Sequence, residues 1–357
     1  MVSDIKVNDN ENTRIQLFIR ELGIYVISVT AALTIISIIL AAIGYNVLSA
    51  LRTLLTTSFR SYFGFEETIK KMIPLIFTTY AFTIPFMIKF FNIGGWGQML
   101  VGGTMTAVVG LVLAPFNIPS VLMVPLLLTV GIAAGGLYGA IAGFLQSRYD
   151  INPIISTIML NFIAANFLNF IATAPPFKDP LEGHPITLPL PKSALLGFVA
   201  GIPYSFVFAL ISIVFVSILL NRTRLGYEIK AVGYNRDAAK TYGVNFSTTI
   251  LYTFLVGGAL AGLGGSLEII NIHGKLIEGF AKTSGAQYGI FGILTSLIVA
   301  GNPVGVPIAA FFMSVLLVGA DSMQRTMQIP VEMVFLSQSL IVLFIVTIRE
   351  RLNLKKM

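Results

Sequence analysis

The chain has 357 residues, of which 55% are hydrophobic and 11% are charged, and its mean hydropathy is +0.86. A soluble domain carries about twice that charged fraction, so the composition excludes a soluble globular protein. The formal net charge of +7 does not indicate nucleic-acid binding, because that function needs a basic face on a folded soluble surface. Cysteine is absent, which excludes disulfides, thiolate metal sites and a cysteine nucleophile.

Apolar runs long enough to cross a bilayer recur from one end of the chain to the other. We therefore expect an all-α integral membrane protein with about ten transmembrane helices in a domain over residues 22–348. The segment 44–72, which mixes acidic and basic residues, is expected to lie along the membrane interface. The expected spans cover residues 22–43, 73–91, 98–115, 120–146, 154–174, 203–221, 248–270, 285–300, 305–320 and 329–348.

The distribution of Lys and Arg predicts how the chain is oriented. If the N-terminus is cytoplasmic, ten spans place 14 of the 23 Lys and Arg residues on the cytoplasmic side. Positively charged loops favour that side of a cell membrane. We therefore expect a cytoplasmic N-terminal segment at 1–21, a cytoplasmic tail at 349–357 and a cytoplasmic loop at 222–246. The proline-rich segment 175–202 is then extracytoplasmic.

Small residues repeat every four positions in two of the expected spans. Gly131, Gly135, Gly139 and Gly143 share this spacing, and a second set runs from Gly257 to Gly265. Such residues stack on one helix face and allow a neighbouring backbone to approach closely. Tight packing is the preferred interpretation. The alternative is that these faces slide during gating.

Charged residues avoid the middle of every expected span. Lys89, Glu268, Asp321 and Glu332 lie near span ends, where long side chains can reach the interface. Ion-coupled transporters usually need buried charged relays. This pattern argues against proton coupling and a strongly charged solute, whereas sodium coupling through backbone carbonyls stays open.

Neutral amides are frequent in the same spans. An unpaired amide in hydrocarbon costs about 2–7 kcal/mol, so each amide must pair between helices or face a wet path. The turn at 92–98 holds three glycines, two amides and Trp96, the one tryptophan of the chain, and irregular backbone at membrane depth must be buried or line a cavity. The alternative for Trp96 is an anchor at the lipid headgroups. We predict a solute pathway lined by Asn92, Trp96, Gln98, Asn161 and Asn166.

Enzymatic motifs are missing from the sequence. There is no His-Glu-x-x-His motif, no nucleophile elbow and no phosphate-binding loop for ATP. His184 and His273 are expected to be solvated residues of extracytoplasmic loops. We assign no catalytic residue, no metal site and no cofactor, and a membrane-embedded transferase is disfavoured.

The loop at 222–246 carries the most informative pattern, TRLGYEIKAVGYNRDAAKTYGVN at 223–245. Asp237-Ala238-Ala239, followed by Gly243, predicts a short helix ended by a glycine. Tyr234, Ala238 and Tyr242 are expected on one side of it, which suits docking into a groove of a soluble partner. The alternative is a solvated loop.

This loop resembles the EAA---G signature by which permeases of ATP-binding-cassette (ABC) importers contact their ATPases, with Asp237 in place of Glu. Over residues 70–345 the chain is similar to permeases for simple sugars, nucleosides and branched-chain amino acids, and above all to the nucleoside branch. A riboflavin permease shares that pattern, and Trp96 stands where the family commonly has Glu. The similar segments are FNIGGWGQ at 91–98, ISTIMLN at 155–161, GGALAGLGG at 257–265 and NPVG at 302–305.

The resemblance implies a permease bundle of the cobalamin-importer type in the cytoplasmic (inner) membrane. It implies ATP-driven import of a neutral polar solute, most of all nucleosides, with simple sugars or riboflavin as alternatives and an ion-coupled secondary transporter as the other class. The implied partners are the lipid bilayer, an ABC ATPase with two fused cassettes, a second non-identical permease and an extracytoplasmic solute-binding lipoprotein. Residues implied to contact the ATPase are Arg224, Gly226, Glu228, Gly233, Asn235, Asp237, Ala238, Ala239 and Gly243.

Overall fold

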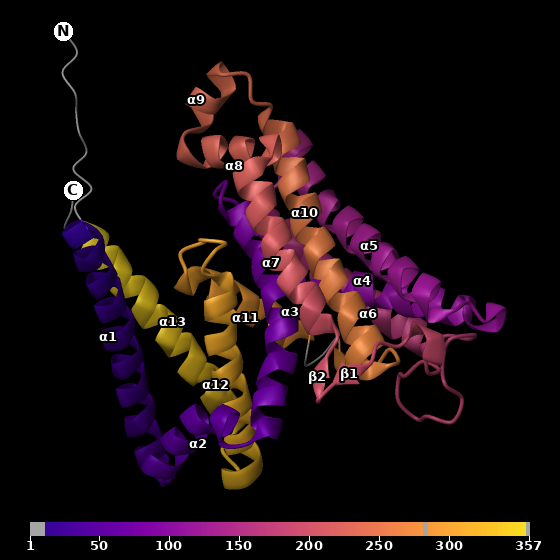
Figure 1. Cartoon of the computed structure of the whole chain (residues 1–357), viewed down its shortest axis with the longest axis horizontal. Coiled ribbons are helices and arrows are strands. Elements are labelled where there is room, and N and C mark those ends of the chain that lie inside the picture. Colours follow the sequence, from indigo (N-terminus) through magenta and orange to yellow (C-terminus); the bar gives the residue numbers. More distant parts are fainter. Residues whose placement is uncertain (1–10, 281–284, 355–357) are drawn as a thin grey trace. The chain divides into compact units, whose positions relative to one another are not determined.

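The computed structural model describes residues 11–280 and 285–354, and this part of the chain is built almost entirely of helices (Figure 1). The longer helices are α1 (Glu11–Ile43), α2 (Val47–Arg60), α3 (Tyr62–Phe86), α4 (Gly95–Val112), α5 (Ser120–Tyr149), α6 (Pro153–Thr173), α7 (Ser205–Arg222), α8 (Arg224–Tyr234), α10 (Phe246–Leu267), α11 (Gly285–Ile298), α12 (Val306–Met327) and α13 (Val331–Leu354). Shorter elements are η1 (Ala114–Phe116), η2 (Lys192–Ala194), β1 (Phe198–Val199), β2 (Ile202–Pro203), α9 (Arg236–Thr241) and the π-helix η3 (Glu268–His273).

A helix lies at each of the ten expected spans. Six helical stretches of the described residues are long and apolar enough to cross a membrane: α4, α5, α6, α7, α12 and α10 together with η3. The apolar parts of α1, α11 and α13 are shorter, and α3 contains Lys70, Lys71 and two prolines. The chain is thus a multi-pass α-helical membrane protein, and the number of ten crossings stays a prediction.

The expected interfacial segment 44–72 is divided between two helices. Ser61 ends α2 and begins α3, because its hydroxyl accepts a hydrogen bond from the Gly64 backbone N–H at 3.1 Å. Residues 62–72 therefore continue directly into the following span. The prediction of a segment separate from the spans is wrong for residues 62–72, and the location of α2 along the membrane interface stays a prediction.

The chain forms two compact units, residues 1–55 with 319–357 and residues 56–318. In the first unit, α1 packs against α13. Gly319 of α12 also lies so close to α2 that a Cβ atom there would be 2.0 Å from the Leu54 carbonyl oxygen. The second unit contains α3 to α11 and the predicted functional segments.

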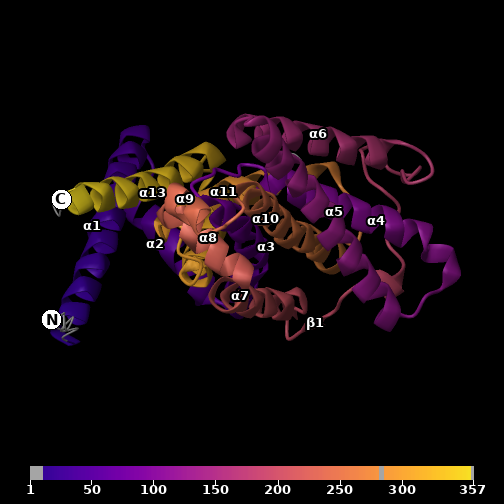
Figure 2. The same cartoon turned by 90° about the horizontal axis from the view of Figure 1, so that it is seen from above.

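The centre of the second unit is α10, which packs against α3, α4 and α5 (Figure 2). A Cβ atom at Gly135 of α5 would lie 2.5 Å from the Gly258 carbonyl oxygen, and one at Gly262 would lie 2.2 Å from the Gly131 carbonyl oxygen. Backbone therefore meets backbone along the small-residue faces. The predicted tight packing of these glycines is confirmed.

The proline-rich segment 175–202 is fastened to the end of α10. Leu196 N–H donates to the Ile270 carbonyl at 2.9 Å, and Leu190 N–H donates to the Gly274 carbonyl at 2.8 Å. The Asn271 amide accepts from the Ser205 N–H at 2.8 Å and donates to the carbonyls of Leu196 and Gly197. The segment is thus an ordered cover over η3 rather than an independent loop.

Two expectations about this end of α10 are wrong. Glu268 is only 4% exposed and does not reach an interface, and His273 lies in η3 with its Nε2 atom 3.4 Å from Glu268 Oε2. Helical backbone continues beyond α10 to His273, and the stretch packs against α4 near Gly103. That continuation buries Glu268 and leaves His273 half-buried. His184, in contrast, is exposed.

Candidate coupling surface and solute pathway

The predicted helix around Asp237 is present as α9, and a second short helix, α8, precedes it. The Thr223 hydroxyl caps α8 by accepting from the Gly226 N–H at 3.2 Å. The Asn235 side chain separates the two helices and accepts from the N–H groups of Asp237 and Ala238, each at 3.0 Å. Such side-chain acceptors satisfy N–H groups that the first turn of a helix leaves unpaired.

Two glycines of α8 set its position on the longer helices. A Cβ atom at Gly226 would lie 2.3 Å from the Leu219 carbonyl oxygen of α7, and one at Gly233 would lie 2.2 Å from the Met87 carbonyl oxygen at the end of α3. The backbone of α8 thus rests directly on the backbone of both helices.

The outer face of α8 and α9 is rich in exposed aromatic side chains. Tyr234 is 90% exposed and Tyr242 is 85% exposed, and Tyr227 and Ala238 are also exposed. Ala239 is buried instead. Tyrosine is enriched in the buried cores of protein interfaces, so this face has the composition of a docking surface.

Two arginines of the segment have partners within it. The Arg224 guanidinium contacts the Glu228 carboxylate at 2.8 Å, and the Arg236 guanidinium lies 3.6 Å from the centre of the Phe246 ring. Gly243 follows α9 with a φ of +82°, and no other atom lies within 4 Å of the place where its Cβ would be. The backbone there favours glycine, but the space beside it is open.

Three of the predicted pathway amides converge on the turn before α4. Asn92 and Gln98 donate to each other's side-chain oxygens at 3.2 and 3.1 Å, and Asn92 also donates to the Ala81 carbonyl at 2.9 Å. Asn161 of α6 accepts from the Gly97 N–H at 2.9 Å and donates to the Ile93 carbonyl at 3.0 Å. All three side chains are buried, and together they hold the turn in its irregular conformation.

The other two predicted pathway residues lie apart from this cluster. Trp96 packs against α11, where a Cβ atom at Gly289 would be 2.5 Å from the Trp96 Cβ, and its buried indole N–H has no hydrogen-bond partner within the described residues. Asn166 is exposed on α6 beside exposed Phe162 and Ile163, and its amide donates to the Phe162 carbonyl at 2.8 Å. Figure 2 shows α6 at the edge of the second unit.

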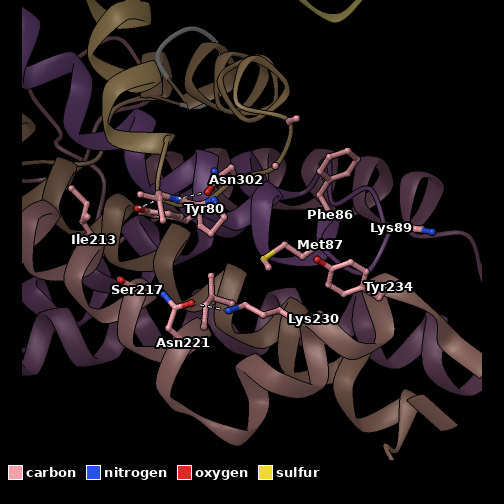
Figure 3. Close-up of a pocket in the computed structure, with 16 residues that line it drawn as sticks. Tyr80, Phe86, Met87, Lys89, Ile213, Ser217, Asn221, Lys230, Tyr234 and Asn302 are labelled. Atoms are coloured by element: carbon pink, nitrogen blue, oxygen red, sulfur yellow. Dashed lines mark hydrogen bonds between the residues drawn. The ribbon is translucent and has the colours of Figure 1, made fainter. Parts of the chain in front are cut away.

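The structure also contains a pocket of about 670 Å³ that the sequence did not predict. It lies beside α8, between the ends of α3 and α7 and the loop at 300–304 (Figure 3). Tyr80 of α3 forms one wall, and its hydroxyl donates to the Pro303 carbonyl at 3.2 Å. The Asn302-Pro303 turn was a local signal of this loop, but nothing in the sequence indicated that four distant segments meet there.

The fold defines a multi-pass α-helical membrane protein. Residues 64–348 match the family described as the permease component of branched-chain amino acid transport systems. The guanosine ABC transporter permease protein NupP of Bacillus subtilis is 31% identical over 87% of this chain and 88% of its own length. The nucleoside permease NupB of Lactococcus lactis is 31% identical over 87% of this chain and 86% of its own.

A glucose ABC transporter permease protein, TsgB13 of Haloferax volcanii, is 29% identical over 91% of this chain and 87% of its own. No solved structure matches the chain significantly. The chain belongs to this family of ABC transporter permeases.

Proposed function

We propose that this permease imports a neutral polar solute, most of all a nucleoside, in a complex powered by ATP. Two relatives at 31% identity carry nucleoside or guanosine in their names. Among the predicted pathway residues, the exposed amide of Asn166 and the indole of Trp96 are uncharged and suit hydrogen bonding to and stacking on a flat neutral ring. A simple sugar is the second candidate, because another relative is a glucose permease, and riboflavin stays an alternative.

The observation that supports the coupling proposal is that the backbone of α8 contacts the backbone of α7 at Gly226 and the end of α3 at Gly233. We infer that an ABC ATPase docks on the tyrosine-rich face of α8 and α9, and that Arg224, Glu228, Asn235, Asp237 and Ala238 lie in or beside that contact. Gly226 and Gly233 pass its movement to α7 and α3. Ala239 supports the surface from its buried side. The ATPase is proposed to carry two fused cassettes.

The pathway proposal assigns different tasks to the predicted residues. The side chains of Asn92, Gln98 and Asn161 are hydrogen-bonded within the turn before α4. They would therefore shape the wall of the solute pathway. Asn166 stands on an exposed apolar face of α6, where an amide is costly in lipid. We propose that it faces the solute path, with a second, non-identical permease opposite. Trp96 would form the wall next to α11.

Orientation follows from the same proposal. The face of α8 and α9 would be cytoplasmic, together with both termini. The cover formed by residues 175–202 would lie outside and receive a solute-binding lipoprotein. A permease bundle of the cobalamin-importer type accommodates this arrangement.

The test is uptake by the complete complex in proteoliposomes. Labelled guanosine should accumulate only with ATP and binding protein present, and unlabelled nucleosides should compete more strongly than glucose or riboflavin. Competition by glucose alone would select the sugar alternative. Uptake that needs an ion gradient and no ATP would instead support the ion-coupled class and contradict the proposal.

A further inference from the structure

The pocket beside α8 has an uneven distribution of charge. Its 16 lining residues include Lys89 and Lys230 and no Asp or Glu. The Lys230 ammonium donates to the Asn221 amide oxygen at 2.7 Å, which leaves two of its three N–H groups for another acceptor. Neither lysine has a carboxylate partner in the part of the chain that the structure describes. The pocket therefore favours an anion.

The position of these groups directs the anion to one wall. Figure 3 shows Lys230 and Asn221 facing each other on the side of α7 and α8, with Tyr80 and Asn302 on the opposite side. Lys89 lies at the periphery and its amine points away from the pocket. Lys230 is thus the cation that contacts an occupant, and Lys89 adds charge at the rim.

The surroundings of the pocket are apolar and belong to membrane helices. Val214 and Ile218 of α7 are exposed, and Val304 at the edge of the pocket is 68% exposed. Leu220 and Ile213 continue this apolar surface into the pocket itself. A water-soluble anion gains nothing from such side chains, whereas acyl chains bury them.

We propose that this pocket binds the headgroup of an anionic phospholipid from the leaflet on the side of α8 and α9. The phosphate accepts hydrogen bonds from Lys230, and the acyl chains lie against α7 and Val304. Basic pockets between membrane helices bind anionic lipid headgroups in this way. Because Lys230 belongs to α8 and the pocket is also lined by α7, Gly233 and Met87, the lipid ties α8 to α7 and α3 beside the Gly233 contact. The inference does not depend on which solute the permease carries.

The experiment compares phosphatidylglycerol with phosphatidylcholine in nanodiscs that contain the complete complex, with bound lipid counted by native mass spectrometry. Lys230→Gln should weaken phosphatidylglycerol binding about fivefold, the factor that corresponds to about 1 kcal/mol per lysine near an anionic surface. Ser217→Trp should displace the lipid without changing the charge, because Ser217 lines the pocket. If Lys230→Gln does not fold, the Ser217→Trp variant tests the proposal instead.

The matched control is Arg148→Gln. Arg148 is an exposed cation at the end of α5, which adjoins the start of α10 through the hydrogen bond from Ser247 to the Ser147 carbonyl. This variant should retain phosphatidylglycerol. Equal retention by wild type, Lys230→Gln and Ser217→Trp would overturn the proposal, as would equal loss in the control. Displacement of the lipid by glycerol 3-phosphate at matching concentration would assign the pocket to a soluble phosphate ester instead.

Discussion

Single amides of this permease differ in what they do even where they look alike in sequence. Asn161 and Asn166 lie five residues apart on α6, yet Asn161 is buried and bonded to the turn before α4, whereas Asn166 is exposed and bonded within its own helix. The first is placed to hold structure. The second is the residue that we propose to face the solute path.

Leucine substitutions separate these two tasks. Asn161→Leu leaves the buried Gly97 N–H and Ile93 carbonyl without partners, so we expect it to lower the free energy of unfolding by about 1–3 kcal/mol. Asn166→Leu should leave thermal stability in detergent unchanged and reduce solute uptake. The reverse pattern, with Asn166→Leu unstable and Asn161→Leu stable, would contradict both assignments.

Gly243 provides a second residue-scale test. Gly243→Arg has space for its side chain but must adopt a left-handed backbone conformation, which costs about 1–2 kcal/mol, and it presents a bulky cation beside the proposed ATPase contact. We expect uptake and solute-stimulated ATPase activity to fall together while membrane insertion survives. Gly243→Asn is the control, because asparagine tolerates this conformation. Wild-type activity of Gly243→Arg in the reconstituted complex would show that this segment is not the contact.

The helices α5 and α10 meet through backbone contacts. Adjacent glycines of α5 therefore differ in how well they tolerate substitution by a residue with a side chain. A Cβ atom at Gly135 would meet backbone atoms of α10 at 2.5 Å, whereas one at Gly136 would lie 3.3 Å from both the Ala259 Cβ and the Leu255 carbonyl oxygen. A contact with backbone at 2.5 Å requires the two helices to separate, whereas contacts at 3.3 Å require a shift of only a few tenths of an ångström. Position on the helix face therefore decides which glycine is essential.

The matched pair Gly135→Ala and Gly136→Ala tests this contact. Overpacking of a tight interior costs about 1–3 kcal/mol, so Gly135→Ala should lower the midpoint of thermal unfolding and Gly136→Ala should change it little. Unfolding followed by tryptophan fluorescence in detergent gives the measurement. Equal midpoints for the two variants would mean that α5 and α10 do not meet along this face.

On the scale of the whole molecule, the proposed orientation places two exposed sites on opposite sides of the membrane. Tyr234 lies on the face of α8, and Leu181 lies in the proline-rich cover and is 94% exposed. Cysteine is absent from the chain, so a single introduced cysteine reacts without background.

We expect an impermeant maleimide to label a Tyr234→Cys variant in inside-out vesicles and a Leu181→Cys variant in right-side-out vesicles. The physical basis is the excess of Lys and Arg on the side of α8 and α9. Labelling of both variants from the same side would contradict the topology, and an exchange of the two results would invert it.

The sequence by itself determined the features that depend on neighbouring residues. Hydropathy placed a helix at each expected span, since a segment that enters lipid must satisfy its own backbone groups. The acidic start and terminal glycine of α9 were readable because helix ends are satisfied by residues a few positions away. The loop that resembles the ATPase-contact signature also indicated the family.

Only the tertiary structure decided which distant groups meet. Glu268 is buried beside the half-buried His273 rather than exposed at a span end, the cover at 175–202 is fastened to η3, and Asn161 completes a turn that lies 64 positions before it in the sequence. The pocket at Lys230 likewise draws its walls from four separate segments. An amide or a charge in a membrane needs a partner, but hydropathy and spacing do not specify that partner, because the pairing depends on how helices far apart in the chain pack together.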